Sequence, residues 1–238
     1  MQKEELREYQ ERYKEVEKLY KDKIAIINGN KYSFTNITSQ EMIRIFVFYT
    51  QSFPKEKNNI DFSFLSSDEG VSITKLIENK VEFNGNLLSM QENHWELYPE
   101  DYLLFITNAI AFYSFPCLKS LNNLKDFNTK LDYFSKNNIL EIKDKKYNYS
   151  KLTHLKRVEI FGYYTKIESK IVSGDFSFLL ENKCNELIDY FNKITTYNHH
   201  AICNLANHWN DNLDSYLLYI IMSFGIISYP FLRGKVTN

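Results

Sequence analysis

The chain has 238 residues, of which 44% are hydrophobic and 25% charged, with only seven glycines and four prolines, so extensive disorder is excluded. Its 29 basic and 30 acidic side chains leave a formal net charge of −1, which argues against a basic nucleic-acid binder and against an acidic nucleic-acid mimic. Aromatic residues make up 16% of the chain, and such residues fill cores and also form partly exposed contact surfaces.

Cysteine use and the first residues point to a cytoplasmic protein. The three cysteines are far apart and lack CxxC spacing, so we expect reduced thiols; they are Cys117, Cys184 and Cys203. The opening stretch, MQKEELREYQERYKEVEK, is hydrophilic and rich in Glu, which is not the pattern of a signal peptide.

In chain order, the first predicted elements are a helix and a hairpin. Steps of three and four between apolar side chains predict an amphipathic first helix. The hairpin is predicted for residues 24–34, IAII-NGN-KYSF, where two β-type runs flank an Asn-Gly turn. The side chains on the apolar face of the helix are Leu6, Tyr9, Tyr13, Val16 and Tyr20.

Further helices are predicted after the hairpin. Thr38 and Glu41 have the spacing of a capping box before a mostly apolar helix. We expect helices around 70–80 and 86–95, and a long apolar helix from Pro99 to about Phe115 that ends at Pro116. These elements predict an α+β module that is predominantly α-helical.

The sequence repeats itself. DFSFL occurs at 61–65 and again at 175–179, and a shift of 114 residues also aligns 92–95 with 206–209 and 101–119 with 215–233. With a shift of 115 residues the first helix matches a second set, Leu121, Leu124, Leu131 and Phe134. We therefore predict a tandem duplication of a helix, β-hairpin, multi-helix module.

The two predicted module copies are residues 1–118 and 119–238, packed together as one globule in a pseudo-twofold arrangement. Most residues that persist in both copies are apolar or aromatic, which is typical of packing. Chemistry is expected where the copies differ or between them.

Two apolar stretches have the length of short membrane spans. Residues 102–118 and 216–232 each run 17 residues without a formal charge. Polar side chains within them and the hydrophilic remainder of the chain favour buried core helices and no membrane. A membrane-associated protein anchored by these two helices is the alternative.

One group of potential metal ligands occurs in the second copy only. If 200–208 is helical, then His200 and His208 share a face, and His199 and Cys203 lie nearby; zinc binds such nitrogen and sulfur donors. However, His208 matches His94, and the first copy has no other ligand there. The sequence therefore favours no metal and no cofactor.

No catalytic signature is present. The chain has no nucleophile elbow, no HExxH and no glycine-rich phosphate loop. Asp175, His200 and His208 are the residues of a rival hypothesis, an enzyme, metal-dependent or hydrolytic, with a site in copy two or between the modules. A repeated polar set consists of Asp61 and Asp175, His94 and His208, and Tyr49 and Tyr164; the Asp residues are expected to cap turns.

The leading hypothesis is a non-enzymatic, cytoplasmic protein-binding protein. It depends on the absence of catalytic motifs and charge bias and on the aromatic-rich composition. Its specific form is an immunity protein that neutralises a cognate toxin; the expected partner is another protein and not a nucleic acid.

Overall fold

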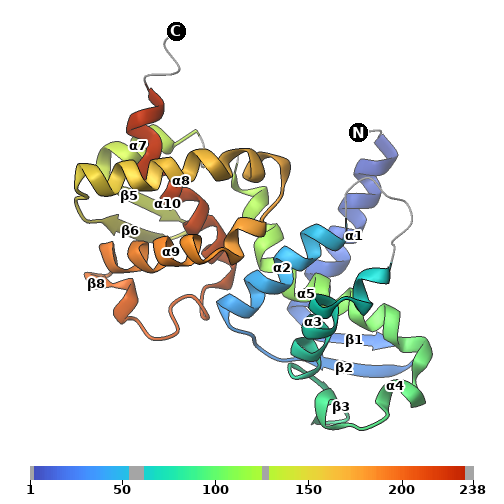
Figure 1. Cartoon of the computed structure of the whole chain (residues 1–238). Helices are drawn as coiled ribbons and strands as arrows, with labels where there is room; N and C mark the ends of the chain where they lie inside the picture. Colours follow the sequence, from blue (N-terminus) through green and yellow to red (C-terminus); the bar gives the residue numbers. More distant parts are fainter. Residues whose placement is uncertain (1–2, 54–61, 125–128, 234–238) are drawn as a thin grey trace. The chain divides into compact units, whose positions relative to one another are not determined.

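The fold is described from a computed structural model, which places residues 3–53, 62–124 and 129–233. The chain forms two compact units, Met1–Phe115 and Pro116–Asn238, and each is mainly helical with one small antiparallel sheet (Figure 1). The α+β, mostly helical class is confirmed. We describe each unit by itself.

Unit 1 combines a four-stranded sheet with helices. Its elements are α1 (Lys3–Asp22), β1 (Ile24–Ile27), β2 (Asn30–Phe34), α2 (Ser39–Ser52), the 3₁₀ turn η1 (Phe62–Ser66), α3 (Asp68–Glu78), β3 (Val81–Phe83), β4 (Asn86–Leu87), η2 (Leu88–Met90), α4 (His94–Leu97), η3 (Pro99–Asp101) and most of α5 (Tyr102–Asn122).

The predicted first helix and its packing role are confirmed in α1. The rings of Tyr13 and Tyr20 each lie 5.2 Å from the ring of Phe115 in α5. On the polar side, Lys21 forms an ion pair of 3.1 Å with Glu17. The side chains of Leu6 and Tyr9 lie outside the described residues.

The predicted hairpin is confirmed. Asn28 and Gly29 have φ values of 48° and 87°, as a two-residue turn with two left-handed positions requires, and Ile27 pairs with Asn30. β2 also pairs with β3, and β3 with β4, so the sheet order is β1-β2-β3-β4. The sheet is therefore larger than the sequence predicts.

The helix expected around 86–95 is wrong. Asn84 and Gly85 have φ values of 52° and 78°, so they reverse the chain as Asn28 and Gly29 do. The residues after them form β4, a 3₁₀ turn and then the short helix α4. The Asn-Gly turn in this position makes a second hairpin instead of a helix start.

The start of α2 is as predicted. Thr38 Oγ1 accepts a hydrogen bond from the Glu41 backbone N–H (3.2 Å), and the Glu41 carboxylate accepts one from the Thr38 N–H (2.7 Å). These two bonds complete a capping box.

The core of unit 1 lies between the sheet and α5. Tyr32 and Phe34 of β2 and Phe83 of β3 are at most 5% exposed. The ring of Phe34 stacks on Phe112 at 4.4 Å, and that of Tyr32 lies 5.1 Å from Phe105. Alternate residues of β2 thus bury their rings under α5.

Unit 2 has a sheet of the same order. Its elements are the end of α5, α7 (Leu131–Asn137), β5 (Ile139–Ile142), β6 (Lys145–Tyr149), α8 (His154–Ser173), η4 (Ser177–Leu180), α9 (Asn182–Ile194), β7 (Thr195–Tyr197), β8 (His200–Ala201), η5 (Ile202–Asn204) and α10 (Leu213–Leu232). The sheet order is β5-β6-β7-β8. Its hairpin pair Ile142 and Lys145 matches Ile27 and Asn30 of unit 1.

The single helix expected for the start of the second copy is wrong. α5 ends at Asn122 and α7 begins at Leu131, with turns at Asn123 and at Thr129 and Lys130. Asn and Thr are poor helix formers because their side chains compete for backbone hydrogen bonds. Thus Leu121 and Phe134 lie in different helices.

The predicted helix end at Pro116 is also wrong, because this proline lies inside α5, as Pro230 lies inside α10. A proline inside a helix costs about 3 kcal/mol. The neighbours of Pro116, Phe115 and Cys117, are 1% and 0% exposed, so burial of this turn of α5 offsets the cost. In α10 the helix ends two residues after Pro230.

In the described part of the chain, two helical stretches are long and apolar enough to cross a membrane. They are Pro99–Asn122 and Leu213–Leu232, and 61% and 78% of their apolar windows are buried. The core helix of a soluble protein meets the same criteria, so length and composition do not distinguish the two cases.

Candidate functional site

A buried carboxylate marks the most distinctive polar site of unit 1. Asp101 is 0% exposed. Its Oδ1 accepts a hydrogen bond from Asn28 Nδ2 (2.8 Å), and its Oδ2 accepts from Asn30 Nδ2 (2.7 Å) and from Tyr32 Oη (2.8 Å). Its hydrogen-bond donors in the described residues are therefore neutral amides and a phenol, without a Lys or Arg among them.

Local structure brings these groups together. The Asn-Gly turn places Asn28 and Asn30 at the tip of the first hairpin, and the alternation of β2 turns Tyr32 toward α5. Asp101 is the last residue of η3, directly before α5. A helix N-terminus favours a negative charge, so this position suits a carboxylate.

The electrostatics keep Asp101 ionised. Burial alone would raise the pKa of Asp101, but the hydrogen bonds from Asn30, Tyr32 and Asn28 outweigh it and hold the pKa below its ordinary value. Burial raises the pKa of Tyr32, and its hydrogen bond to Asp101 adds to this. Tyr32 therefore stays protonated and donates.

His94 joins the cluster through Tyr32. Its Nε2 lies 3.3 Å from Tyr32 Oη. Because the Tyr32 hydroxyl donates its hydrogen to Asp101, the N–H at Nε2 of His94 donates to the hydroxyl oxygen. Burial lowers the pKa of His94, with Asp101 opposing, and the neutral ring packs between Phe83 (4.6 Å) and Trp95 (4.6 Å).

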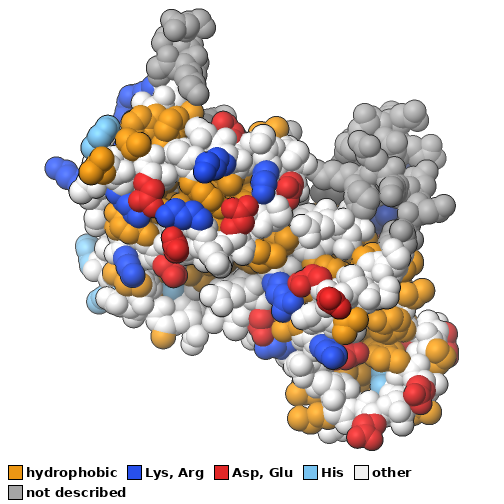
Figure 2. Space-filling model, in the orientation of Figure 1, with side chains coloured by type: hydrophobic (Ala, Val, Ile, Leu, Met, Phe, Trp, Pro, Cys, Tyr) orange, Lys and Arg blue, Asp and Glu red, His pale blue; other side chains and the backbone are white. Residues whose placement is uncertain are grey.

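The segment that Asp101 anchors exposes leucines. Leu97, Leu103 and Leu104 are 70%, 46% and 51% exposed, and Glu96 before them and Glu100 between them are exposed too. No Lys or Arg occurs in the sequence from 81 to 118. Figure 2 shows hydrophobic and acidic side chains next to each other over the part of unit 1 that contains α4. We call these five residues the acidic–apolar surface.

Unit 2 keeps the aromatic part of this cluster. Tyr147 Oη lies 3.4 Å from His208 Nε2, and Trp209 stacks on Tyr147 at 5.7 Å. These contacts correspond to those of Tyr32 with His94 and Trp95. The ring cluster therefore has a packing role in both units.

The polar part differs between the units. Lys143, Lys145 and Ser215 stand where unit 1 has Asn28, Asn30 and Asp101. Lys143 pairs with Asp214, and Lys145 donates to Asn212. The leucines that match Leu103 and Leu104 are buried in unit 2; they are Leu217 and Leu218. The acidic–apolar surface is thus specific to unit 1.

The structure does not assemble the predicted metal ligands. Asn198 and His199 have φ values of 49° and 68° and form the turn between β7 and β8, so His200 lies on a strand and Cys203 in η5. The condition for a shared helical face of His200 and His208 is not met, because residues 200–208 form β8, η5 and a turn instead of an α-helix. Among the described residues, no group of three or more His, Cys, Asp or Glu side chains could hold a metal ion.

The rival catalytic residue Asp175 has a local structural role. Asp175 Oδ1 accepts a hydrogen bond from the Ser177 N–H (2.9 Å), which lowers the pKa of Asp175, so its side chain closes an Asx turn directly before η4. Within the described part of the chain, no hydrogen bond or ion pair joins Asp175 to His200 or His208. Asp61 lies outside the described residues.

The remaining pair of the repeated polar set is also split. Tyr49 stacks on Phe53 at 5.3 Å. Tyr164 instead donates a hydrogen bond to Glu168 at 3.5 Å. These two tyrosines therefore have different neighbours.

Asp101 and its three donors are the residues that sequence reasoning missed. A signal was present, since Asp101, Asn28 and Asn30 are polar positions at which the two halves of the sequence differ. Neither a family model nor a curated protein nor a solved structure matches the chain. Its function must therefore be argued from its surfaces.

Proposed function

We propose that this chain is a non-enzymatic, cytoplasmic protein-binding protein whose acidic–apolar surface contacts the partner. The observation that carries the proposal is that Leu97, Leu103 and Leu104 are 46–70% exposed on a segment held by the buried Asp101 network. Exposed leucines close together in the sequence favour an interaction surface.

Rigidity of this segment favours binding. Burying an exposed leucine stabilises a complex by about 1.5–3 kcal/mol at most, and ordering a flexible segment would cost part of that gain. The three hydrogen bonds to Asp101 hold the turn before α5 in place before any partner arrives.

Charge indicates the chemistry of the partner. Glu96 and Glu100 lie among the leucines, with no basic residue in the same stretch of sequence, so a basic partner surface with apolar side chains is the complement. Toxins that act on nucleic acids carry basic substrate-binding surfaces. An immunity protein that covers such a surface is the specific form of this proposal.

The test is a pull-down of the tagged full chain from a lysate of its source, with two variants compared. Leu97→Ser with Glu96→Lys and Glu100→Lys reverses the charge of the surface and removes its most exposed leucine. The matched control, Leu155→Ser with Glu186→Lys, changes exposed residues of unit 2. A basic partner retained by the wild type and the control but lost with the surface variant supports the proposal; a partner retained equally by all three contradicts it.

We also propose that the chain is a tandem duplication, with copies 1–118 and 119–238 packed as one globule about a pseudo-twofold axis. Support comes from the equal strand orders, the matched hairpin registers and the two Tyr–His–Trp clusters. An experimental structure in which no twofold rotation relates the two units would contradict the arrangement.

One alternative function has an observation in its favour. Two apolar stretches meet the length criterion of a membrane span, Pro99–Asn122 and Leu213–Leu232. This observation favours the alternative of a membrane-associated protein. Full recovery of the protein in the soluble fraction without detergent would reject that alternative.

A further inference from the structure

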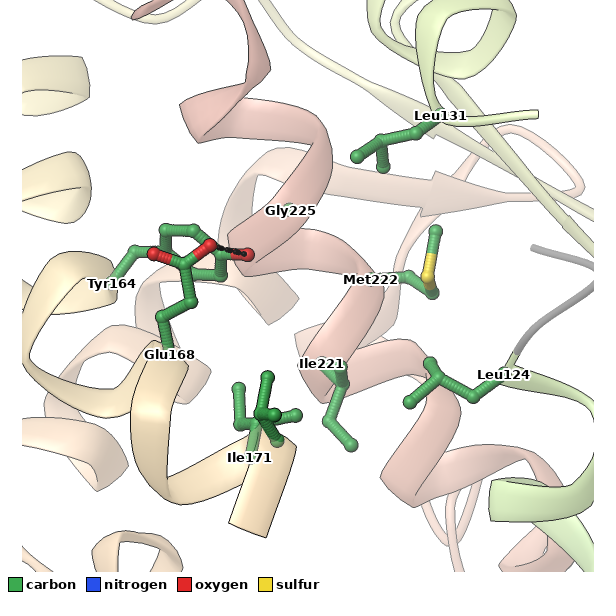
Figure 3. Close-up of a pocket in the computed structure, with 9 residues that line it drawn as sticks. Leu124, Leu131, Tyr164, Glu168, Ile171, Ile221, Met222 and Gly225 are labelled. Carbon is green, nitrogen blue, oxygen red and sulfur yellow. Dashed lines mark hydrogen bonds between the residues drawn. The ribbon is translucent and has the colours of Figure 1, made fainter. Parts of the chain in front are cut away.

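A groove in unit 2 crosses α10 at Gly225. Its volume is about 340 Å³, which lies in the range of small-molecule sites. Figure 3 shows Tyr164 and Glu168 of α8 on one side of α10 and Leu131 and Met222 on the other. Most of the lining side chains are aliphatic.

Gly225 lets Leu131 pack closely on α10 beside the groove. A Cβ atom at this position would lie 3.3 Å from Leu131 Cδ1, so a larger side chain there would push Leu131 into the groove. In the sequence of unit 1 the matching residue is Ala111. The residues that match Tyr164 and Glu168 are Tyr49 and Phe53, whose rings stack at 5.3 Å. The carboxylate of Glu168 thus has no counterpart at the matching position of unit 1.

That polar side carries a single negative charge. Among the described residues that line the groove, Glu168 is the charged one, and it accepts a hydrogen bond from Tyr164 Oη at 3.5 Å. Burial raises the pKa of Tyr164 to about 12, and Glu168 adds to this, so the hydroxyl remains a donor. One hydrogen bond leaves the carboxylate with further acceptor capacity.

We propose that this groove binds a small molecule that combines an aliphatic chain with a protonated amine. The chain lies along the groove against Leu131 and Ile171, next to Met222, and the amine meets the carboxylate of Glu168. An anionic head group would be repelled by Glu168, and a neutral one would lack the charge-assisted hydrogen bond. The site is independent of the acidic–apolar surface of unit 1.

The methionines allow a direct test on the full chain. With methyl-¹³C methionine, NMR reports separately on Met222 in the groove, on Met42, which is 0% exposed in unit 1, and on Met90, which is 75% exposed there. We expect n-octylamine to shift Met222 in a saturable way while Met42 and Met90 stay constant. We expect 1-octanol to bind more weakly and octanoate not to bind.

Two variants test the head group and the groove. Glu168→Gln is expected to lower the affinity for n-octylamine about fivefold, to that for 1-octanol, because the carboxylate is solvent-exposed. Glu186→Gln, an exposed glutamate of α9, is the matched control and should bind as the wild type does. Gly225→Leu is expected to abolish binding of both; if that variant does not fold, Glu168→Gln still decides.

Three outcomes would overturn the proposal. They are the absence of a saturable Met222 shift, equal affinities of the wild type for n-octylamine and 1-octanol, and parallel shifts of Met90 and Met222. The last would indicate adsorption to exposed apolar surface rather than a site.

Discussion

The hydroxyl of Tyr32 donates a hydrogen bond of 2.8 Å to Oδ2 of Asp101, which lies 69 residues further along the chain. This bond ties the second strand of the first hairpin to the start of α5. Both groups are 0% exposed, so neither exchanges its partner for water. The contact therefore fixes the turn that carries the acidic–apolar surface.

Replacing Asp101 is expected to destabilise the protein. In Asp101→Asn the new amide group would face side chains that are themselves donors, and the buried hydroxyl of Tyr32 would lose its charged acceptor. We expect the free energy of unfolding to fall by about 2–3 kcal/mol, measured by urea denaturation. Asp211→Asn, at an exposed position, is the control and should change it by less than about 0.5 kcal/mol. Equal effects of the two would contradict a role for the network.

The two buried histidines predict a loss of stability in mild acid. Burial lowers the pKa of His94 and His208, so between the folded and unfolded pKa values the unfolded state binds more protons. Their contribution is therefore present above about pH 6.5 and is lost as the pH falls below it. We expect the free energy of unfolding to drop between about pH 7.5 and about pH 5.5, and to drop less in His94→Gln. The exposed His154→Gln is the control; an equal pH dependence in both variants would refute the assignment.

Asp101 predicts a second, more acidic step. Its pKa is lowered in the folded state, so its contribution is complete above about pH 4, the unfolded value, and is lost as the pH falls through the lower folded value. Acid titration of the wild type should show this step, and the titration of Asp101→Asn should lack it. A step of unchanged size in the variant would assign it to another carboxylate.

The sequence predicted those elements that depend on neighbouring residues. The Asn-Gly dipeptide sets the turn between β1 and β2, and Thr38 with Glu41 sets the start of α2. The sequence did not predict β3 and β4, which have three and two residues. Strands this short carry too little alternation to be distinguished from a helix, and they form because β2 offers a free edge.

The candidate site was missed for a different physical reason. Asn28, Tyr32 and Asp101 meet only after the sheet packs on α5, and no local pattern in the sequence encodes that contact. The helix continues through Pro116 for a similar reason, because burial of its neighbours outweighs a local preference.

In the matching turns before β4 and β8, removing a glycine and introducing one are expected to have opposite effects on stability. Gly85 and His199 both have positive φ, 78° and 68°, and no atom lies within 4 Å of a Cβ built on Gly85. Gly85→Ala is therefore expected to cost about 1 kcal/mol through backbone strain alone, and His199→Gly to stabilise by up to about 1 kcal/mol. Urea midpoints that shift in the same direction for the two variants would contradict this.

Two helical glycines provide the sharpest packing test. A Cβ atom on Gly70 would lie 2.1 Å from the backbone oxygen of Phe64, whereas none of the surrounding atoms is within 4 Å of a Cβ on Gly162. Gly70 also donates its N–H to the cap residue Ser67 at 3.0 Å, so the start of α3 cannot move away without losing its cap. We expect Gly70→Ala to destabilise by more than about 3 kcal/mol, and Gly162→Ala, inside α8, to stabilise by about 0.5–1 kcal/mol. Thermal and urea unfolding of the two variants measure both; a Gly70→Ala protein as stable as the wild type would show that η1 packs on α3 differently from the arrangement described above.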